Sequence, residues 1–181
     1  RLDRLIREDI RDIEALRDLS ALQVMVELLP EKVGSLFSLN SLREDLGVTH
    51  KTISHWADVL EQFYYHFRIY PFYTTAVKSL RKEPKLYCGD WSEVHSAPAR
   101  LENMVASHLL KMIHFLRDSE GFKTELWFLR NAEGYEVDFL VTNNKKPWFC
   151  VEVKQSADSI SKHLLYFKKH LKIPFAYQVT G

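Results

Sequence analysis

The chain has 181 residues, and its 25 Lys and Arg residues nearly balance its 24 Asp and Glu residues, for a formal net charge of +1. With 46% hydrophobic and 27% charged residues, the composition is that of a folded protein and excludes an intrinsically disordered chain. The near-zero charge also excludes a uniformly basic protein, so any nucleic-acid surface must come from local clustering of charge.

Several global features bear on the cellular setting. Cys88 and Cys150 lie in separate apolar runs without a CxxC partner, which favours two buried, reduced thiols. No run of about 18 apolar residues occurs, so we expect no transmembrane helix and no membrane partner. Residues 1–12 are densely charged and unlike a secretory signal, so we expect a cytoplasmic protein. Because the chain starts with Arg1 rather than Met, we also expect it to be part of a longer protein.

The first third is predicted to be helical. Apolar residues recur with the helical period over 2–16 and predict a first helix. Ser20 is expected to cap a second helix over 22–29, which Pro30 ends.

A helix-turn-helix pattern follows. A short helix over 42–46 should end at Gly47, and Thr49 stands where the N-cap of the next helix belongs. The apolar face of that next helix carries Ile53, Trp56, Val59, Leu60 and Phe63. Two helices joined by a tight turn with Gly, the second polar at its start, are typical of this motif. The residues that we expect to contact DNA are His50, Lys51, Thr52, His55 and Lys82.

The helix-turn-helix is followed by two predicted strands, over 64–70 and 85–88, with a looser polar stretch over 73–84 between them. This is the pattern of a wing, and its basic residues are Lys78, Arg81, Lys82 and Lys85. We therefore predict a helical segment plus a winged helix in residues 1–90. Two alternatives stay open: a winged helix that docks a protein, and wing lysines and arginines that are only solvated.

The second half has a different order of elements, and we place the boundary within 89–97. A helix is expected from Pro98 to about Leu116, with the apolar stripe Leu101, Val105, Leu109, Met112 and Leu116. Strands are expected over 126–130, 136–141, 148–154 and 175–179. Ser159 is expected to cap a helix before the last strand, with Ile160, Leu164, Phe167 and Leu171 facing inward. The predicted class is therefore α+β or α/β, with an α-β-β-β-α-β order over 96–181.

Two of these strands carry acidic residues that alternation would bring together. Side chains alternate faces along a strand, and paired strands lie about 4.8 Å apart. If the strands pair, Asp138 and Glu152 could direct their oxygens at a common point. Two carboxylates that close repel each other unless a cation lies between them, and Mg²⁺ or Mn²⁺ suits such oxygen ligands. Lys154 projects from the same face as Glu152 and could orient or deprotonate a water, or stabilise charge on a phosphate.

These residues carry a resemblance to a known superfamily. Asp138 followed by Glu152-Val153-Lys154, on consecutive strands after a helix that bears Glu102, resembles the PD-(D/E)XK nucleases. The resemblance implies a restriction-endonuclease-like fold in which Glu102 is an accessory acid, Asp138 and Glu152 bind the metal, and Lys154 is the catalytic lysine. Val137 stands where the motif has its proline.

Nearly the whole chain also resembles the C-terminal region of a group of prokaryotic AAA-type ATPases, a domain of unknown function behind the ATPase core. The segments that carry this resemblance are 7–12, 48–52, 84–87, 101–105 and 136–139. It implies a missing N-terminal ATPase domain as partner, with ATP bound only there, since no GxxxxGK motif occurs in this chain. The chain departs from the group at Leu129, often Trp, and at His108, often a second acid.

The functional hypothesis is therefore a metal-dependent DNA nuclease with a DNA-binding winged helix. Two alternatives stay open. Glu152 and Lys154 could be a solvated pair on an exposed strand, and an intact nuclease-like fold could bind DNA or protein without cutting. The sequence leaves the choice between DNA and RNA, the oligomeric state and the biological pathway open.

Overall fold

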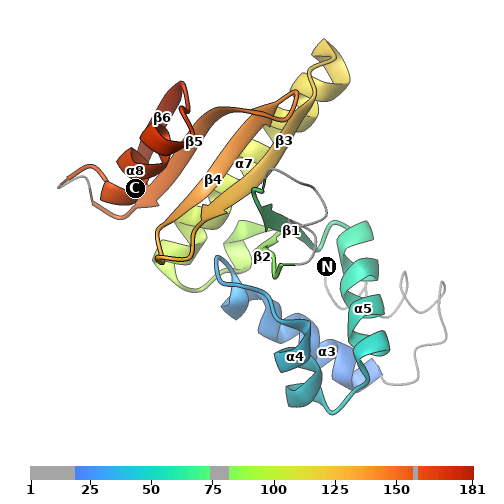
Figure 1. Cartoon of the computed structure of the whole chain (residues 1–181). Coiled ribbons are helices and arrows are strands. Elements are labelled where there is room, and N and C mark those ends of the chain that lie inside the picture. Colours follow the sequence, from blue (N-terminus) through green and yellow to red (C-terminus); the bar gives the residue numbers. More distant parts are fainter. Residues whose placement is uncertain (1–18, 74–81, 157–158) are drawn as a thin grey trace.

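Figure 1 shows the computed structural model, which describes residues 19–73, 82–156 and 159–181. The helix predicted over 2–16 lies outside these residues, and so do Lys78 and Arg81 of the predicted wing.

The described chain opens with helices, lower right in Figure 1. They are α3 (Leu19–Leu28), the 3₁₀ helix η2 (Leu29–Lys32), α4 (Leu39–Leu46) and α5 (His50–Gln62). Pro30 lies in the first turn of η2, where its missing N–H costs nothing. Gly47 ends α4 with a φ of 65°, and its N–H bonds to the carbonyls of Arg43 and Glu44. The Thr49 side chain accepts a hydrogen bond from the N–H of Thr52 and caps α5. The predicted cap and turn of this helix pair are thus confirmed.

The two strands of the predicted wing exist, but they belong to the main sheet. Strand β1 (His66–Pro71) pairs antiparallel with β2 (Lys85–Cys88). On its other side β1 pairs in parallel with β3 (Thr124–Arg130) through Tyr70 and Pro71. The result is one six-stranded mixed sheet in the order β2-β1-β3-β4-β5-β6. The expectation that all four wing cations decorate a surface loop is wrong for Lys85, since every residue of β2 is buried.

The second half has the predicted order of one helix, three strands, a helix and a strand. After the 3₁₀ turn η3 (Trp91–Glu93), α7 (Ala97–Glu120) runs behind β3 and β4 in Figure 1. The remaining elements are β4 (Glu136–Asn143), β5 (Lys146–Lys154), α8 (Lys162–His170) and β6 (Phe175–Thr180). Strands β3, β4 and β5 are antiparallel neighbours, and β6 joins β5 in parallel. The division into residues 1–90 and 96–181 stays a prediction.

The predicted buried face of α7 is wrong in detail. The stripe that includes Leu101 is only half-buried, whereas Asn103, Ala106 and Ile113 are the buried residues of the helix. The reason is long-range, because the Asn103 amide donates to the carbonyl of Cys88 at 2.8 Å and accepts from the N–H of Cys88 at 2.7 Å. Helical periodicity cannot predict this polar contact with β2.

The start of α8 is also shifted from its predicted position. Ser161, rather than Ser159, is the N-cap, and its side chain accepts from the N–H of Leu164. Ile160 therefore precedes the helix and is 62% exposed instead of facing inward. Leu164 and Phe167 are buried as expected.

Two apolar clusters hold the elements together. The larger one joins α3, α4 and α5 to β1, β2 and α7, and reaches Phe139 and Val151 of the sheet. The smaller one joins α8, through Leu164 and Phe167, to β3, β4 and β5. Cys88 and Cys150 are both buried, free thiols, which confirms the prediction for them. In the ranges that the structure describes, we find no helix with the length and apolar character needed to cross a bilayer.

Candidate active site

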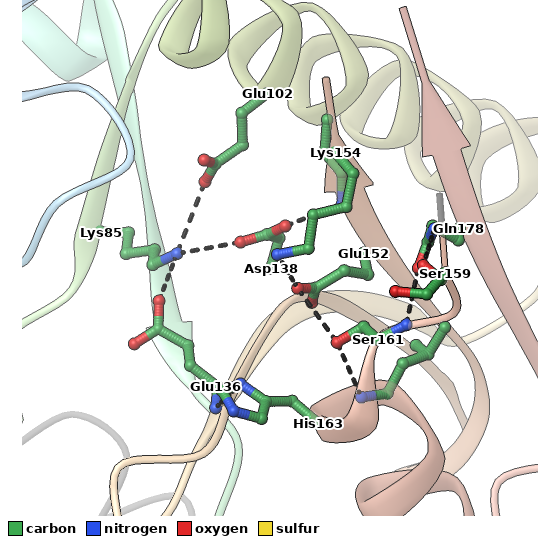
Figure 2. A network of polar contacts seen from close by, with 12 residues as sticks. Lys85, Glu102, Glu136, Asp138, Glu152, Lys154, Ser159, Ser161, His163 and Gln178 are labelled. Carbon is green, nitrogen blue, oxygen red and sulfur yellow. Dashed lines mark hydrogen bonds and ion pairs between the residues drawn. The ribbon is translucent and has the colours of Figure 1, made fainter. Parts of the chain in front are cut away.

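The predicted acidic pair is assembled by strand register. Phe139 of β4 pairs with Val151 of β5, so Asp138 and Glu152 are the next residues along these antiparallel neighbours. Both carboxylates lie in one polar network at the end of the two strands (Figure 2). The Oδ2 atom of Asp138 accepts a hydrogen bond from the backbone N–H of Val153 at 2.8 Å. The side chain of Asp138 is thereby fixed by β5 itself.

Glu152 is a buried carboxylate, and its two oxygens differ in their contacts with the described residues. Its Oε1 lies 2.6 Å from Nζ of Lys154 and 3.4 Å from Oγ of Ser161. Its Oε2 is buried and has no hydrogen-bond partner in the described part of the chain. Burial raises the pKa of Glu152 and the charge of Asp138 raises it further, whereas Lys154 lowers it. A buried oxygen without a partner is costly, so this atom marks a place where a ligand would be stabilised.

Lys154 is the outward-facing member of the pair. Its side chain is 48% exposed, while that of Glu152 is 4% exposed. The hydrogen bond to Glu152 raises the pKa of Lys154, although burial opposes the shift. The Lys154 ammonium therefore stays charged and is open to solvent on one side.

Glu102 reaches the same network from α7. Its Oε1 accepts a hydrogen bond from the Tyr87 hydroxyl at 2.7 Å and lies 3.4 Å from Nζ of Lys85. Burial raises the pKa of Glu102, Lys85 lowers it and Asp138 raises it. Gly34 packs closely against this carboxylate, since a Cβ at that position would lie 3.0 Å from Oε2 of Glu102. With its φ of 74° as well, position 34 requires glycine.

Lys85 is the centre of the acidic network and was not predicted there. Its Nζ lies 2.7 Å from Glu136, 3.4 Å from Glu102 and 3.4 Å from Asp138 (Figure 2). The residue is only 2% exposed. Burial lowers the pKa of Lys85, but the three carboxylates outweigh burial and raise it above the ordinary value. Lys85 is thus a buried cation, not a basic residue on a wing.

Sequence reasoning missed three members of the network: Lys85, Tyr87 and Glu136. The available signal was alternation, because Lys85 and Tyr87 are polar residues two apart in an otherwise apolar strand. Glu136 stands in the same relation to Asp138. Alternation showed that each pair shares a face, but not that the two faces meet.

The segment before α8 supports the network from the side. The backbone N–H of Ser161 donates to Oε1 of Gln178 at 2.8 Å, and Nε2 of Gln178 donates to the carbonyl of Ser159 at 2.9 Å. Nδ1 of His163 accepts from the N–H of Glu136 at 3.4 Å. These bonds tie the N-terminus of α8 to β4 and β6, so Ser161 is held beside Glu152.

The predicted DNA-contacting residues lie elsewhere, on α5 and before β2. His50, Lys51, His55 and Lys82 are exposed, and Thr52 is half-buried with its hydroxyl 2.9 Å from that of Thr49. None of these five residues is among those labelled in the polar network of Figure 2. Their exposure suits a ligand surface and suits a solvated one equally.

The donor set fits a hard divalent cation. Mg²⁺ binds oxygen ligands, commonly one or two carboxylates, and keeps several waters. Asp138 and Glu152 supply such oxygens on adjacent strands, and Oε2 of Glu152 lacks a partner among the described residues. Over those same residues, no group of three or more His, Cys, Asp or Glu side chains is arranged as a ready metal cage.

Comparison with known proteins shows two family matches. The model of a domain of unknown function, DUF8612, matches residues 1–103. The model of another domain of unknown function, DUF4143, matches residues 99–180. No curated protein and no solved structure matches the chain. The two matches together span the helices, the sheet and the carboxylate network, and neither family description states an activity.

Proposed function

This chain belongs to the DUF8612 family, a domain of unknown function, and we propose that it carries a metal-dependent phosphodiesterase site of the PD-(D/E)XK nuclease-like type, with DNA as substrate. One observation carries the proposal: strand register brings Asp138 and Glu152 together, with Lys154 on the same strand as Glu152. The observed α-β-β-β-α-β order supports the corresponding nuclease-like fold.

Asp138 and Glu152 are the residues that would hold Mg²⁺ or Mn²⁺. When bound, such an ion polarises a phosphate oxygen and lowers the pKa of a bound water. Among the described residues Oε2 of Glu152 has no hydrogen-bond partner, so a ligand bound there would break no contact of that atom with them. Asp138 has one oxygen held by the Val153 amide and the other close to Lys85.

Lys154 acts as a fixed positive charge. Because its hydrogen bond to Glu152 raises its pKa, the ammonium remains protonated near neutral pH and is a poor general base. Its exposure lets it reach a phosphate oxygen and stabilise the negative charge that grows there during hydrolysis.

Glu102 is a positioning residue in this scheme. The Tyr87 hydroxyl and the Lys85 ammonium fix its carboxylate, and Gly34 gives it room. Its negative charge holds Lys85 in place, and Lys85 in turn contacts Asp138.

Residues 1–90 would bind the DNA substrate and hold it near the site. We place DNA at the N-terminal turn of α5 and at the segment before β2, through His50, Lys51, Thr52, His55 and Lys82. Four of these residues are exposed, so a DNA ligand could reach them. The resemblance described above extends the proposal to the whole protein, in which this region would follow an AAA-type ATPase core that binds ATP.

The test is a cleavage assay on duplex DNA, single-stranded DNA and RNA with Mg²⁺ or Mn²⁺. Asp138→Asn and Lys154→Ala should each slow cleavage by about 100-fold or more, because each removes a charge used in the transition state. Lys146→Ala, which alters an exposed lysine at the start of β5, is the matched control. A Lys154→Ala protein that cuts as fast as the parent would refute the catalytic assignment.

A second candidate function is a nuclease-like fold that binds DNA or a protein partner without cutting. The observation that favours it is Lys85, which neutralises part of the acidic cluster without a metal. This alternative predicts binding that needs no Mg²⁺ and survives Asp138→Ala. A salt series separates the two kinds of partner, because affinity for phosphates falls steeply with salt and affinity for a protein need not.

A further inference from the structure

Lys85 is the cation that contacts three carboxylates of this site. Its ammonium is surrounded by carboxylates from three directions, with Glu102 on α7 and Glu136 and Asp138 on β4. In the described part of the chain, the charged groups next to this cluster include Arg130, 3.4 Å from Glu136, and the Lys154–Glu152 pair. Lys85 is the buried one among the cations of the site.

The same ammonium conflicts with a metal at Asp138. Oδ2 of Asp138 accepts from the Val153 N–H at 2.8 Å, whereas the contact of Oδ1 is longer, so Oδ1 is the oxygen that a metal would bind more readily. That Oδ1 atom is the one 3.4 Å from Nζ of Lys85. A divalent cation bound to Oδ1 would face the ammonium at short range inside a buried site, where like charges repel strongly.

We propose that Lys85 is the resident countercation of the acidic cluster, and that a divalent cation binds at Asp138 and Glu152 in competition with it. This inference rests on the proposed function, since it concerns the same site. It makes metal binding depend on the first half of the chain, because Lys85 comes from β2, the edge strand of the sheet.

The position of β2 is set by residues far from the carboxylates. It pairs with β1 on one side, and it forms single bridges to Val33 and Leu36 just after η2. Gly34 in the same short segment donates its N–H to the carbonyl of Leu86 and packs against Glu102. A movement of this segment would therefore move Lys85 and change the affinity of the site for a metal.

Titration of the chain with Mn²⁺ by calorimetry tests the competition. Lys85→Gln removes the charge but leaves an amide that can donate to Glu136, and it should bind Mn²⁺ at least tenfold more tightly than the parent. Lys85→Arg keeps the cation and should bind no more tightly than the parent. Lys146→Gln removes an exposed lysine and should leave the affinity unchanged.

Net charge alone could strengthen metal binding, and a double variant separates that effect. Lys85→Gln/Glu136→Gln loses one cation and one carboxylate, so the formal charge of the cluster equals that of the parent. Competition predicts that the double variant still binds Mn²⁺ at least tenfold more tightly than the parent. An affinity equal to that of the parent would show that only net charge matters and would overturn the proposal.

Folding gives a second readout. If a metal can replace the ammonium, Mn²⁺ should raise the melting temperature of Lys85→Gln by several degrees more than that of the parent. A Lys85→Gln chain that stays unfolded in millimolar Mn²⁺ would contradict the proposal, as would equal Mn²⁺ affinities in Lys85→Gln and the parent. These outcomes are distinct from a failed cleavage assay, because competition for a metal can be observed in a protein that cuts nothing.

Discussion

In the described part of the chain, the half-buried Arg68 and the buried Lys85 each contact more than one carboxylate, and the two clusters differ in geometry. Arg68 of β1 donates from Nε to Oε2 of Glu61 at 2.8 Å and from its backbone N–H to Oε1 of Glu61 at 3.0 Å. A terminal nitrogen of Arg68 also pairs with Asp58 at 2.7 Å and with Glu61. Lys85 of β2 has one contact of 2.7 Å and two of 3.4 Å.

The comparison shows how the geometry of the cation distinguishes a purely structural ion-pair cluster from one that could also bind a ligand. A guanidinium offers five donors in a planar fork, so Arg68 saturates Glu61 and joins α5 firmly to β1. An ammonium is a compact charge with three donors. Lys85 lies near three carboxylates, but only Glu136 is within 3 Å of its Nζ. The Arg68 cluster is complete by itself, whereas the Lys85 cluster holds carboxylates for which a divalent cation could compete with the ammonium.

Of the substitutions that compare the two clusters, the one at Lys85 should have the largest effect on stability. Lys85→Gln in metal-free buffer should lower the free energy of unfolding by about 3–5 kcal/mol, because it leaves three partly buried carboxylates without their buried countercharge. Urea denaturation with EDTA measures the loss. A cost as small as that of an exposed lysine, with Lys146→Gln as reference, would show that the ammonium is not needed to hold the carboxylates.

A buried titratable group without a strong countercharge makes a third case. Burial lowers the pKa of His66 on β1 from 6.5 to about 4, Glu61 and Asp58 raise it, and Arg68 lowers it. Below pH 6.5 the unfolded chain therefore takes up a proton that the folded chain refuses, and stability falls as the pH drops from 6.5 to 4. The difference amounts to about 3 kcal/mol.

The parent and His66→Phe should be compared by denaturation at pH 7 and pH 4. The variant should lose less stability over this interval, since Phe has no proton to bind. His95→Gln, which changes an exposed histidine, should keep the slope of the parent. Identical slopes in His66→Phe and the parent would contradict the assignment.

Loss of the Arg68 cluster should have a smaller but clear effect on the free energy of unfolding. Arg68→Met removes the side-chain donors to Glu61, leaves the backbone N–H in place, and should cost about 2 kcal/mol, as expected for hydrogen bonds to a charged group. Arg43→Met is the matched control, because Arg43 forms an exposed pair with Glu44 at 3.2 Å, which should contribute less than about 1 kcal/mol. Equal losses of stability in the two variants would show that the Arg68 cluster contributes no more than an exposed ion pair.

The smallest effect on stability is expected at Thr49, the uncharged N-cap of α5. Thr49→Ala removes the hydroxyl that accepts from the N–H of Thr52 and should cost about 1 kcal/mol. Ser38→Ala is the control, since Ser38 is the N-cap of α4 but makes no side-chain cap bond. Thermal denaturation of both variants should show a loss for Thr49→Ala alone.

Local chemistry is what made parts of the fold and site predictable. Gly47 and Thr49 signal their turn and cap through residues within a few positions of each other, and both predictions are confirmed. The proximity of Asp138 and Glu152 was also predictable, because a tight turn joins β4 to β5 and alternation sets which side chains share a face.

The errors share a long-range cause. Lys85 lies 53 positions from Asp138 along the chain, and no local pattern relates the two. The buried face of α7 depends on Asn103 meeting the backbone of Cys88. The start of α8 depends on Ser161 meeting Gln178 of β6 and Glu152 of β5. Each of these contacts exists only once the sheet has formed.

The sequence by itself determined the order of helices and strands and the acidic pair with its lysine, because periodicity, caps and alternation act over a few residues. The tertiary structure alone decided that β1 and β2 join the main sheet. That placement buries Lys85 among three carboxylates and turns an apparent surface cation into the central charge of the site. The free energy of a charge depends on what surrounds it, and only the assembled fold sets those surroundings.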